Sequence, residues 1–483
     1  MLITRAEING DYPVDLRCEE GFITEIGTCL SGRKGELILN AQAGTLLPGL
    51  HDHHIHLYAL AATKNSIFCG PPQINNLDEL VQVLRHTPGE TGWVRGTGYH
   101  DSVAGYLDRW QLDRLVSDRP IRVQHRSGKM WILNSMAVDL LGLDKQNELQ
   151  AIELGIERNE RGLATGRLFR LDSWLGEKLK NSSPPNLLNI SMQLARAGVT
   201  GVTDASPTNS IQFLRQLTEA IEKKQLLQRV LVMGDILLPD TDHPLIKRGA
   251  LKILLDEHQL PTFDQLTTTI ADAHCQKRVV AIHCVTQTEL IFALSALAEA
   301  GSKPGDRIEH ASIAPDSALD LLHNTGVTVV TQPGFIKERG DQYLTTVDRI
   351  DHPLLYRCRT LIEAGIPVGG STDAPYGSPD PWTAIAAAVQ RQTLTGQTIG
   401  ERERLTPEQA LALFTSDPES PGGIARPITQ GAPADFCLLD RPWSEARERL
   451  TADDVAATIR AGELIYKKNN IKAPPLLHQH KGS

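Results

Sequence analysis

The sequence predicts an α/β fold built on parallel strands, joined to a small sheet domain made from the two ends of the chain. In the middle of the chain, short apolar strand segments alternate with stretches of helical spacing, which is typical of βα units. At both ends, short strand-like segments are interrupted by Gly and Asp, which is typical of a small β-sheet layer. The 483 residues are enough for a large core and more than one domain.

Both ends of the chain contain short strand segments. The N-terminal set is 2–3, 14–16, 22–26 and 37–39. The C-terminal set is a turn and strand over 431–440, followed by two strands around a glycine turn over 456–466. We therefore expect the two ends to form one sheet domain, with the middle of the chain inserted between them.

The middle region contains five further strand segments, and short apolar runs such as 251–255 and 279–283 are typical of parallel strands covered on both faces. The strands are 251–255, 279–283, 307–310, 327–332 and 368–373, and the helices between them are 262–275, 288–300, 315–324 and 354–364. Four more strand segments precede them, at 93–96, 121–125, 201–204 and 229–233. The total exceeds what an eight-stranded barrel needs, so we expect an insertion at about 65–185. The Pro- and Lys-rich residues 471–483 predict a flexible tail.

The composition excludes several classes of protein. Hydrophobic content of 41% and charged content of 22% are ordinary for a globular protein, and the net charge of −9 gives no reason to expect nucleic acid or an anionic membrane as partner. The seven cysteines include no C-x-x-C pair, which favours a reducing compartment. Neither a signal-like segment nor a membrane-length apolar stretch is visible. We expect a cytoplasmic protein with a small-molecule substrate. The oligomeric state stays open, with a homo-oligomer as one alternative.

A histidine-rich segment at 48–57 is the strongest chemical signal. It places His54 and His56 two residues apart, so that in an extended strand both imidazoles point to one face and can share a metal ion. By the same alternation, His51 and His53 point away from that face. A histidine-rich turn without a ligand is the alternative for this segment alone.

Four further residues follow the strands of the middle region. Lys252 lies inside an apolar strand, and His283, His310 and Asp373 each end a strand. Lys252, His283 and His310 follow one another at about 30 residues, the length of one βα unit. Active sites of parallel barrels lie at the carboxyl ends of the strands, so these side chains would converge there.

Each of these residues also has a structural alternative. His283 and His310 could be core histidines with satisfied hydrogen bonds, and Asp373 could cap the following helix. Lys252 could extend along apolar surface to reach solvent. If it is buried instead, its pKa falls and the neutral amine becomes reactive.

Together these segments resemble the metal-dependent amidohydrolase superfamily. The segment 48–56 resembles its first-strand signature, 371–375 its eighth-strand aspartate motif, and 431–436 the segment where the flanking sheet domain closes. Segments 122–128, 133–135 and 162–166 are most similar to the amidohydrolase 3 branch, which contains N-substituted formamide deformylase-like proteins. The resemblance implies a (β/α)₈ TIM-like barrel over 48–414 and a small β-sandwich domain over 1–47 and 415–470.

The resemblance also implies a metal centre. His54 and His56 would hold one divalent ion with Asp373, and His283 and His310 a second. Lys252 matches the lysine that many members carboxylate with CO₂ to bridge two ions. We expect one or two ions, with Zn²⁺ as the first choice and Mn²⁺, Fe²⁺ or Ni²⁺ also compatible with such donors.

The resemblance implies hydrolysis of a non-peptide C–N bond by a metal-activated water, with Asp373 carrying the proton to the leaving nitrogen. An esterase or lactonase, a deaminase, and a non-catalytic binding relative are the alternatives. His125 and Lys129 either line the substrate pocket or form structural hydrogen bonds. Lys129 stands where many members of the branch carry a histidine, and Arg170 where an acidic residue is usual, so the deformylase substrate does not carry over.

Overall fold

The computed structural model describes residues 1–64, 66–86, 92–145, 150–179 and 184–468. The chain divides into two compact units, which are described separately. Unit 1 combines Met1–Leu57 with the chain from Asn186 onward, and unit 2 is Tyr58–Pro185. Unit 2 contains the region in which the sequence predicts an insertion, about 65–185. The predicted flexible tail, 471–483, lies outside the described residues.

Unit 1 contains a sheet of eight parallel strands, the core of a TIM-like barrel. Each strand pairs with the next along the chain. The strands are β6 (Leu50–Ile55), β13 (Val199–Asp204), β14 (Arg229–Gly234), β15 (Ile246–Leu254), β16 (Val280–Cys284), β17 (Arg307–His310), β18 (Thr328–Thr331) and β19 (Val368–Gly370).

Two backbone hydrogen bonds bring the first and last strands of this sheet together. The amide of Asp373, just after β19, donates to the carbonyl of His54 at 2.9 Å. The amide of His56 donates to the carbonyl of Ala374 at 2.9 Å. Because both bonds lie at the carboxyl end of β6, they nearly close the barrel and place Asp373 beside the two histidines.

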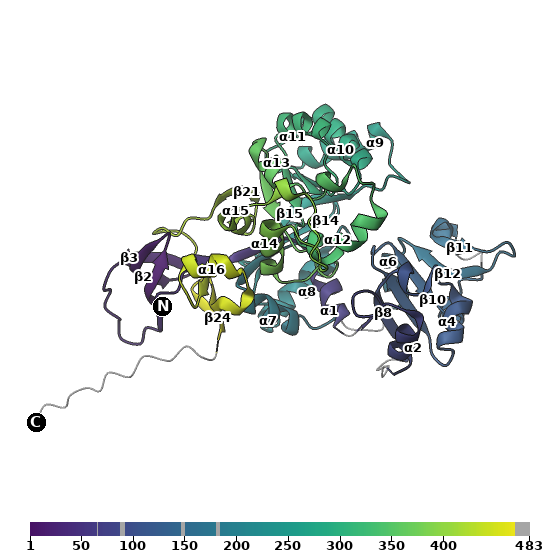
Figure 1. Cartoon of the computed structure of the whole chain (residues 1–483), viewed down its shortest axis with the longest axis horizontal. Helices are drawn as coiled ribbons and strands as arrows, with labels where there is room; N and C mark the ends of the chain where they lie inside the picture. Colours follow the sequence, from purple (N-terminus) through teal and green to yellow (C-terminus); the bar gives the residue numbers. More distant parts are fainter. Residues whose placement is uncertain (65, 87–91, 146–149, 180–183, 469–483) are drawn as a thin grey trace, which may run out of the picture. The chain divides into compact units, whose positions relative to one another are not determined.

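Helices α7 to α15 of unit 1 surround these strands, as Figure 1 shows for α9 to α14. They are α7 (Leu188–Arg196), α8 (Ile211–Glu222), α9 (Phe263–Cys275), α10 (Gln287–Ala300), α11 (Leu319–Thr325), α12 (Gly334–Thr346), α13 (Cys358–Glu363), α14 (Pro381–Gln390) and α15 (Pro407–Ala412). Capping boxes fix the starts of α9, α10 and α15, at Thr262, Thr286 and Thr406. In each, the threonine side chain accepts a hydrogen bond from the backbone amide of the third helical residue. The side chain of that residue accepts one from the backbone amide of the threonine.

Two four-stranded sheets are made from the ends of the chain. The first has the order β3-β2-β1-β4 and the second β24-β23-β22-β5. Their strands are β1 (Leu2–Ile8), β2 (Asp11–Glu19), β3 (Phe22–Gly27), β4 (Ile38–Asn40), β5 (Leu46–Pro48), β22 (Phe436–Leu439), β23 (Val455–Arg460) and β24 (Glu463–Lys467). One apolar cluster joins both sheets, with Ile3 and Leu16 from the first and Phe436 and Ile459 from the second. The two distant ends of the chain therefore share a core.

Unit 2 is built on a six-stranded sheet with helices on both faces. The strand order is β11-β12-β10-β9-β8-β7. The strands are β7 (Ile67–Phe68), β8 (Val94–Tyr99), β9 (Ile121–His125), β10 (Met130–Leu133), β11 (Ile156–Arg158) and β12 (Ala164–Phe169). Strand alternation in β10 sends Met130 and Ile132 into one apolar cluster and Trp131 and Leu133 into another. The first cluster includes residues of α2 (Leu77–His86) and α4 (Arg109–Leu115), the second those of α5 (Ser135–Leu141) and α6 (Asp172–Lys178).

The structure differs from the predicted elements at several points. The predicted strand 368–373 ends at Gly370, because the chain leaves the sheet and turns back toward β6. Strand β15 begins at Ile246, earlier than the predicted 251. The early start was not predicted because polar residues interrupt the apolar pattern in the first part of the strand. Helix α13 begins at Cys358 rather than 354, after a short 3₁₀ turn. The sequence did not predict α12, whose two glycines weaken the helical signal.

Two further observations concern helix length and the cysteines. No helix within the described part of the chain is long and apolar enough to cross a membrane. All seven cysteines are free thiols.

Candidate metal centre

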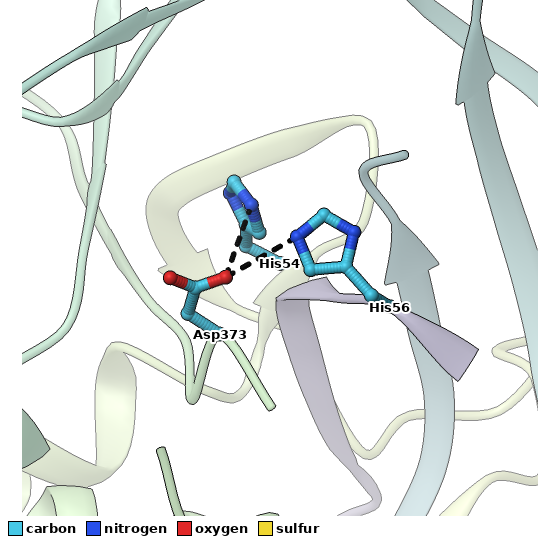
Figure 2. Close-up of side chains that lie close together, drawn as sticks. All are labelled: His54, His56 and Asp373. Carbon is cyan, nitrogen blue, oxygen red and sulfur yellow. Dashed lines mark ion pairs between the residues drawn. The ribbon is translucent and has the colours of Figure 1, made fainter. Parts of the chain in front are cut away.

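Three predicted ligands meet at the carboxyl end of β6. The Nε2 atoms of His54 and His56 lie 3.5 and 3.3 Å from Oδ1 of Asp373, and Figure 2 shows both imidazoles turned toward that carboxylate. Their donor atoms all lie within 4.8 Å of one another, which is close enough to hold one metal ion. Two imidazoles and a carboxylate suit a divalent ion.

Hydrogen bonds on the Nδ1 side hold each imidazole in place. His54 Nδ1 donates to the carboxylate of Glu309. His56 Nδ1 is hydrogen-bonded to the hydroxyl of Ser206 at 2.8 Å, and His310 Nδ1 donates to Oε1 of Gln332 at 2.8 Å. A partner on Nδ1 sets the tautomer and the ring orientation of a ligating histidine, and leaves Nε2 to bind the metal.

Left-handed backbone conformations occur at the site. His310 has a φ of 71°, Ala311 of 44° and Asp373 of 53°. Non-glycine residues rarely adopt such angles, and where they do the surrounding structure must hold them. Asp52 does so beside Asp373, since its carboxylate accepts from the amide of Thr372 at 3.0 Å and from the Thr372 hydroxyl. The left-handed turns therefore redirect the side chains that follow β17 and β19.

The electrostatics of the cluster favour metal binding. Burial and the nearby Lys252 ammonium lower the pKa of His54 to about 3, so its imidazole is neutral. Burial also lowers the pKa of His310. Burial opposes ionisation of Asp373, but a hydrogen bond from His56 and the neighbouring histidines still lower its pKa below the ordinary range. The site thus presents the neutral imidazoles of His54 and His310 and an ionised carboxylate, which are the protonation states of metal ligands.

Lys252 does not reach the surface. Its side chain is only 1% exposed, and its Nζ lies 3.9 Å from Oε2 of Glu309. Among the described residues, Nζ has no hydrogen-bond partner. Burial lowers the pKa of Lys252 to about 8, while the Glu309 carboxylate acts in the opposite direction. The alternative in which Lys252 extends to solvent is therefore wrong, and its amine is placed beside the histidine cluster.

Glu309 is the centre of a buried charge network that the sequence analysis did not assign. Its carboxylate contacts Arg307, His54 and Lys252. Burial raises the pKa of Glu309, but Arg307 and Lys252 outweigh it and hold the carboxylate ionised. Alternation along 307–310 was a readable signal, because residues two apart on a strand share a face and Arg307 and Glu309 can pair there.

The other two predicted histidines extend the cluster. The ring of His310 lies 4.9 Å from that of His54, and the ring of His283 lies 4.5 Å from that of His310, measured between centroids.

His51 and His53, the other two histidines of the first strand, have hydrogen-bond partners outside the cluster. His51 Nε2 is hydrogen-bonded to the Thr203 hydroxyl at 2.9 Å, and His53 Nε2 lies 3.3 Å from the hydroxyl of Ser416.

The two predicted substrate-binding residues belong to unit 2. His125 ends β9, and its Nδ1 is hydrogen-bonded to the hydroxyl of Ser127 at 2.8 Å. The amide of Lys129 donates to that same hydroxyl at 3.3 Å. These contacts lie within unit 2, so the roles of His125 and Lys129 stay predictions.

The fold and the site define a class of protein. A parallel barrel with two spaced histidines and an aspartate at the carboxyl ends of its strands is the architecture of a metal-dependent hydrolase. A model of the amidohydrolase family matches residues 38–466, so the chain belongs to that family. Membership of this family makes it a hydrolase.

Individual proteins are similar to this chain in sequence or in fold. The chain is 27% identical to the N-substituted formamide deformylase of Arthrobacter pascens, over 89% of this chain and 90% of the relative. A crystal structure of an uncharacterized metal-dependent hydrolase from Pyrococcus horikoshii OT3 has the same fold, with a TM-score of 0.70, 20% identity, and coverage of 91% of this chain and 97% of that one. The 5-methylcytosine deaminase of Klebsiella pneumoniae is similar at a TM-score of 0.52, with 14% identity and coverage of 96% and 98%.

Proposed function

We propose that this protein hydrolyses a non-peptide C–N bond in an amide, a cyclic amide or a related group. The convergence of His54, His56 and Asp373 at the carboxyl end of the barrel carries the proposal. Family membership supports the class of reaction. The deformylase from Arthrobacter supports an amide substrate, without fixing which amide.

We propose that the centre holds one or two divalent ions, with Zn²⁺ the first choice. His54, His56 and Asp373 would hold one ion, and His283 with His310 the second. The fit rests on the neutral imidazoles, the ionised carboxylate and the buried amine of Lys252. When bound, a divalent ion supplies Lewis acidity, which acidifies a water and polarises the substrate carbonyl.

Asp373 acts as the proton carrier. Its Oδ1 faces the two imidazoles at the mouth of the barrel, and the pKa of its carboxyl is held low, so the group is the ionised carboxylate, which has a free oxygen for a proton. It takes the proton of the attacking water and delivers it to the leaving nitrogen, which departs as an amine. Glu309, Ser206 and Gln332 hold the imidazoles in position throughout.

Lys252 is proposed to become a bridging ligand by reaction with CO₂. Its neutral amine attacks the carbon of CO₂ and loses a proton, which gives a carbamate anion. Its burial and its lowered pKa favour this reaction, because a neutral amine is the reactive form.

We also propose that the two end sheets, over 1–47 and 415–470, pack as a β-sandwich beside a barrel over 48–414.

The decisive experiment measures metal content beside turnover. The purified protein is stripped with a chelator, reloaded with Zn²⁺ or Mn²⁺, and assayed on a panel of small amides, cyclic amides, esters, lactones and aminopurines. We expect turnover of amides that disappears on stripping and returns with metal. Full activity in verified metal-free protein contradicts the mechanism, and turnover restricted to esters or aminopurines assigns the site to an esterase or a deaminase.

A further inference from the structure

A cationic side chain lies in an aromatic cage next to the metal centre. Arg339 belongs to α12, which starts directly beyond the carboxyl end of β18. Its guanidinium carbon lies 3.9 Å from the centroid of the Phe335 ring. One of its Nη atoms donates to the backbone carbonyl of Tyr376. The Arg339 cage is defined here as Phe335, Tyr343, Tyr356 and Tyr376.

The aromatic residues of the cage pack on one another. The rings of Phe335 and Tyr356 meet edge to face, with centroids 5.7 Å apart. The hydroxyls of Tyr343 and Tyr356 are 3.1 Å apart and hydrogen-bonded. All four residues belong to one apolar cluster, in which Phe335 and Tyr356 are almost fully buried. The ring of Phe335 therefore packs against the partly buried guanidinium, and the three tyrosines belong to the same cluster as that ring.

The charge of Arg339 is not balanced by an ion pair. Within the described ranges of the chain, no carboxylate lies within salt-bridge distance of its guanidinium. The neighbouring Glu338 accepts instead from the amide of Ser378, at 3.0 and 3.2 Å. Burial disfavours the charged form of Arg339, but Tyr343, Tyr356 and, beyond salt-bridge distance, the carboxylates of Asp373 and Glu338 raise its pKa, so the group stays cationic.

One residue connects the cage to the metal centre. The amide of Tyr376 donates to the carbonyl of Asp373 at 2.8 Å. The ring of Tyr376 meets that of His56 edge to face, with centroids 5.7 Å apart. Arg339 donates to the carbonyl of this same residue. Tyr376 therefore contacts both the guanidinium and two of the predicted ligands, Asp373 and His56.

We propose that Arg339 binds a carboxylate of the substrate, so that the preferred substrates are amides carrying an anionic group a few bonds from the scissile C–N bond. This inference rests on the proposed function and names the substrate class of that same site. A planar guanidinium can bind a carboxylate through two parallel hydrogen bonds, and such charge-assisted pairs are stronger than neutral ones. A partly buried cation without a counter-ion is the group that gains most from an anionic ligand.

The test compares acid and alcohol probes that the enzyme cannot cleave. The acid probes are the N-methanesulfonyl derivatives of glycine, β-alanine and γ-aminobutyrate. Each is compared with the N-methanesulfonyl derivative of the matching amino alcohol, in which a hydroxymethyl group replaces the carboxylate. Calorimetry measures their dissociation constants on zinc-loaded wild type, Arg339→Met, Arg339→Lys and Arg349→Met. Arg349 is an exposed arginine just beyond α12, so its variant removes the same charge away from the cage.

We expect at least one acid to bind wild type about 10–100-fold more tightly than its alcohol, the range of a charge-assisted hydrogen-bonded pair. Arg339→Met loses this preference, Arg339→Lys keeps part of it, and Arg349→Met keeps all of it. Equal binding of acid and alcohol to wild type overturns the proposal. So does an acid preference that survives in Arg339→Met with unchanged zinc content and circular dichroism, because the metal alone would then hold the carboxylate.

Turnover of the matching N-formyl compounds separates this proposal from the proposed function. If wild type shows an acid preference that Arg339→Met loses, and wild type cleaves none of these amides or any amide of the wider panel, the assignment as an amide hydrolase fails and Arg339 still binds the carboxylate. If amides are cleaved and the acid preference is absent, the amide hydrolase stands and the role of Arg339 is wrong.

Discussion

At the scale of single residues, the centre depends on how side chains are held as much as on which ones are present. The paired histidines and the aspartate could be predicted, because the spacing of His54 and His56 and the position of Asp373 after an apolar strand are visible in the sequence. The pairing of Glu309 with Arg307 was readable, but the contacts of Glu309 with His54 and of Arg339 with Tyr376 were not, since they join segments far apart in the chain. The left-handed turn at His310 also has no signal in the sequence.

Replacement of Asp373 by Asn tests the proton carrier. The amide keeps the shape and one oxygen but cannot accept the proton, so kcat should fall by about 10²–10⁴-fold. We expect the variant to fold and to keep much of its metal, as judged by circular dichroism and metal analysis. A near-normal kcat in a metal-loaded sample would assign the proton transfer to another residue.

The proposed carboxylation of Lys252 can be tested directly. With ¹³C-labelled bicarbonate and Zn²⁺, wild type should show a carbamate carbon signal in NMR spectra, because the buried amine is the reactive one. Lys252→Ala should lose the signal. Lys247→Ala, which removes an exposed lysine of the same strand, should keep it. A signal that persists without Lys252 places the carbamate elsewhere.

Glu309→Gln should weaken metal binding rather than abolish folding. The neutral amide accepts a weaker hydrogen bond from His54 and leaves Arg307 without its counter-ion, and loss of such an orienting partner costs about 10–100-fold in metal affinity. Competition with a fluorescent zinc chelator measures this. Glu363→Gln, at an exposed carboxylate of α13, is the control and should bind zinc normally. Wild-type affinity in Glu309→Gln would mean that Glu309 does not orient His54.

At the scale of elements, local signals predicted helices better than the sheet edges. Capping boxes at Thr262 and Thr286 mark two helix starts within one residue of the predicted ones. Strand ends were less readable, because packing and closure decide where pairing stops, as for β19. The β8 and β9 segments were recognised as strands, but only tertiary structure places them in the sheet of unit 2.

A close approach between β19 and β21 (Ser420–Ala425) provides a test at this scale. Gly422 has a φ of +79°, and a Cβ there would lie 2.2 Å from the amide nitrogen of Val368. Gly431 has a φ of +85° with nothing within 4 Å of such a Cβ, so Gly431→Ala carries only the backbone strain. We expect Gly422→Ala to lower the free energy of unfolding by about 1–3 kcal/mol more than Gly431→Ala, measured in urea. Equal losses would mean that the neighbouring backbone yields without cost.

At the scale of the whole molecule, metal binding and stability should be linked. An ion that binds only the folded centre stabilises it by about 2.7 kcal/mol at a concentration 100 times its Kd. Adding Zn²⁺ to stripped protein should therefore raise the unfolding temperature, and a chelator should lower it. A variant with both His54→Ala and His56→Ala should respond little, and a response equal to wild type would locate the stabilising ion at another site. Scanning calorimetry measures all three.

The hydrogen bonds that nearly close the barrel also set the order in which the enzyme can be completed. During synthesis His54 emerges long before Asp373, and the bond from the amide of Asp373 to the carbonyl of His54 forms only after the last strand has been made. Pairing across such a separation is slow, because a long loop must close first. A ribosome-bound chain that ends before Asp373 thus offers the ion two imidazoles without their carboxylate. Metal binding to the complete set of ligands should therefore indicate that the barrel has finished folding. Zinc uptake, timed against refolding, should follow the slowest refolding phase.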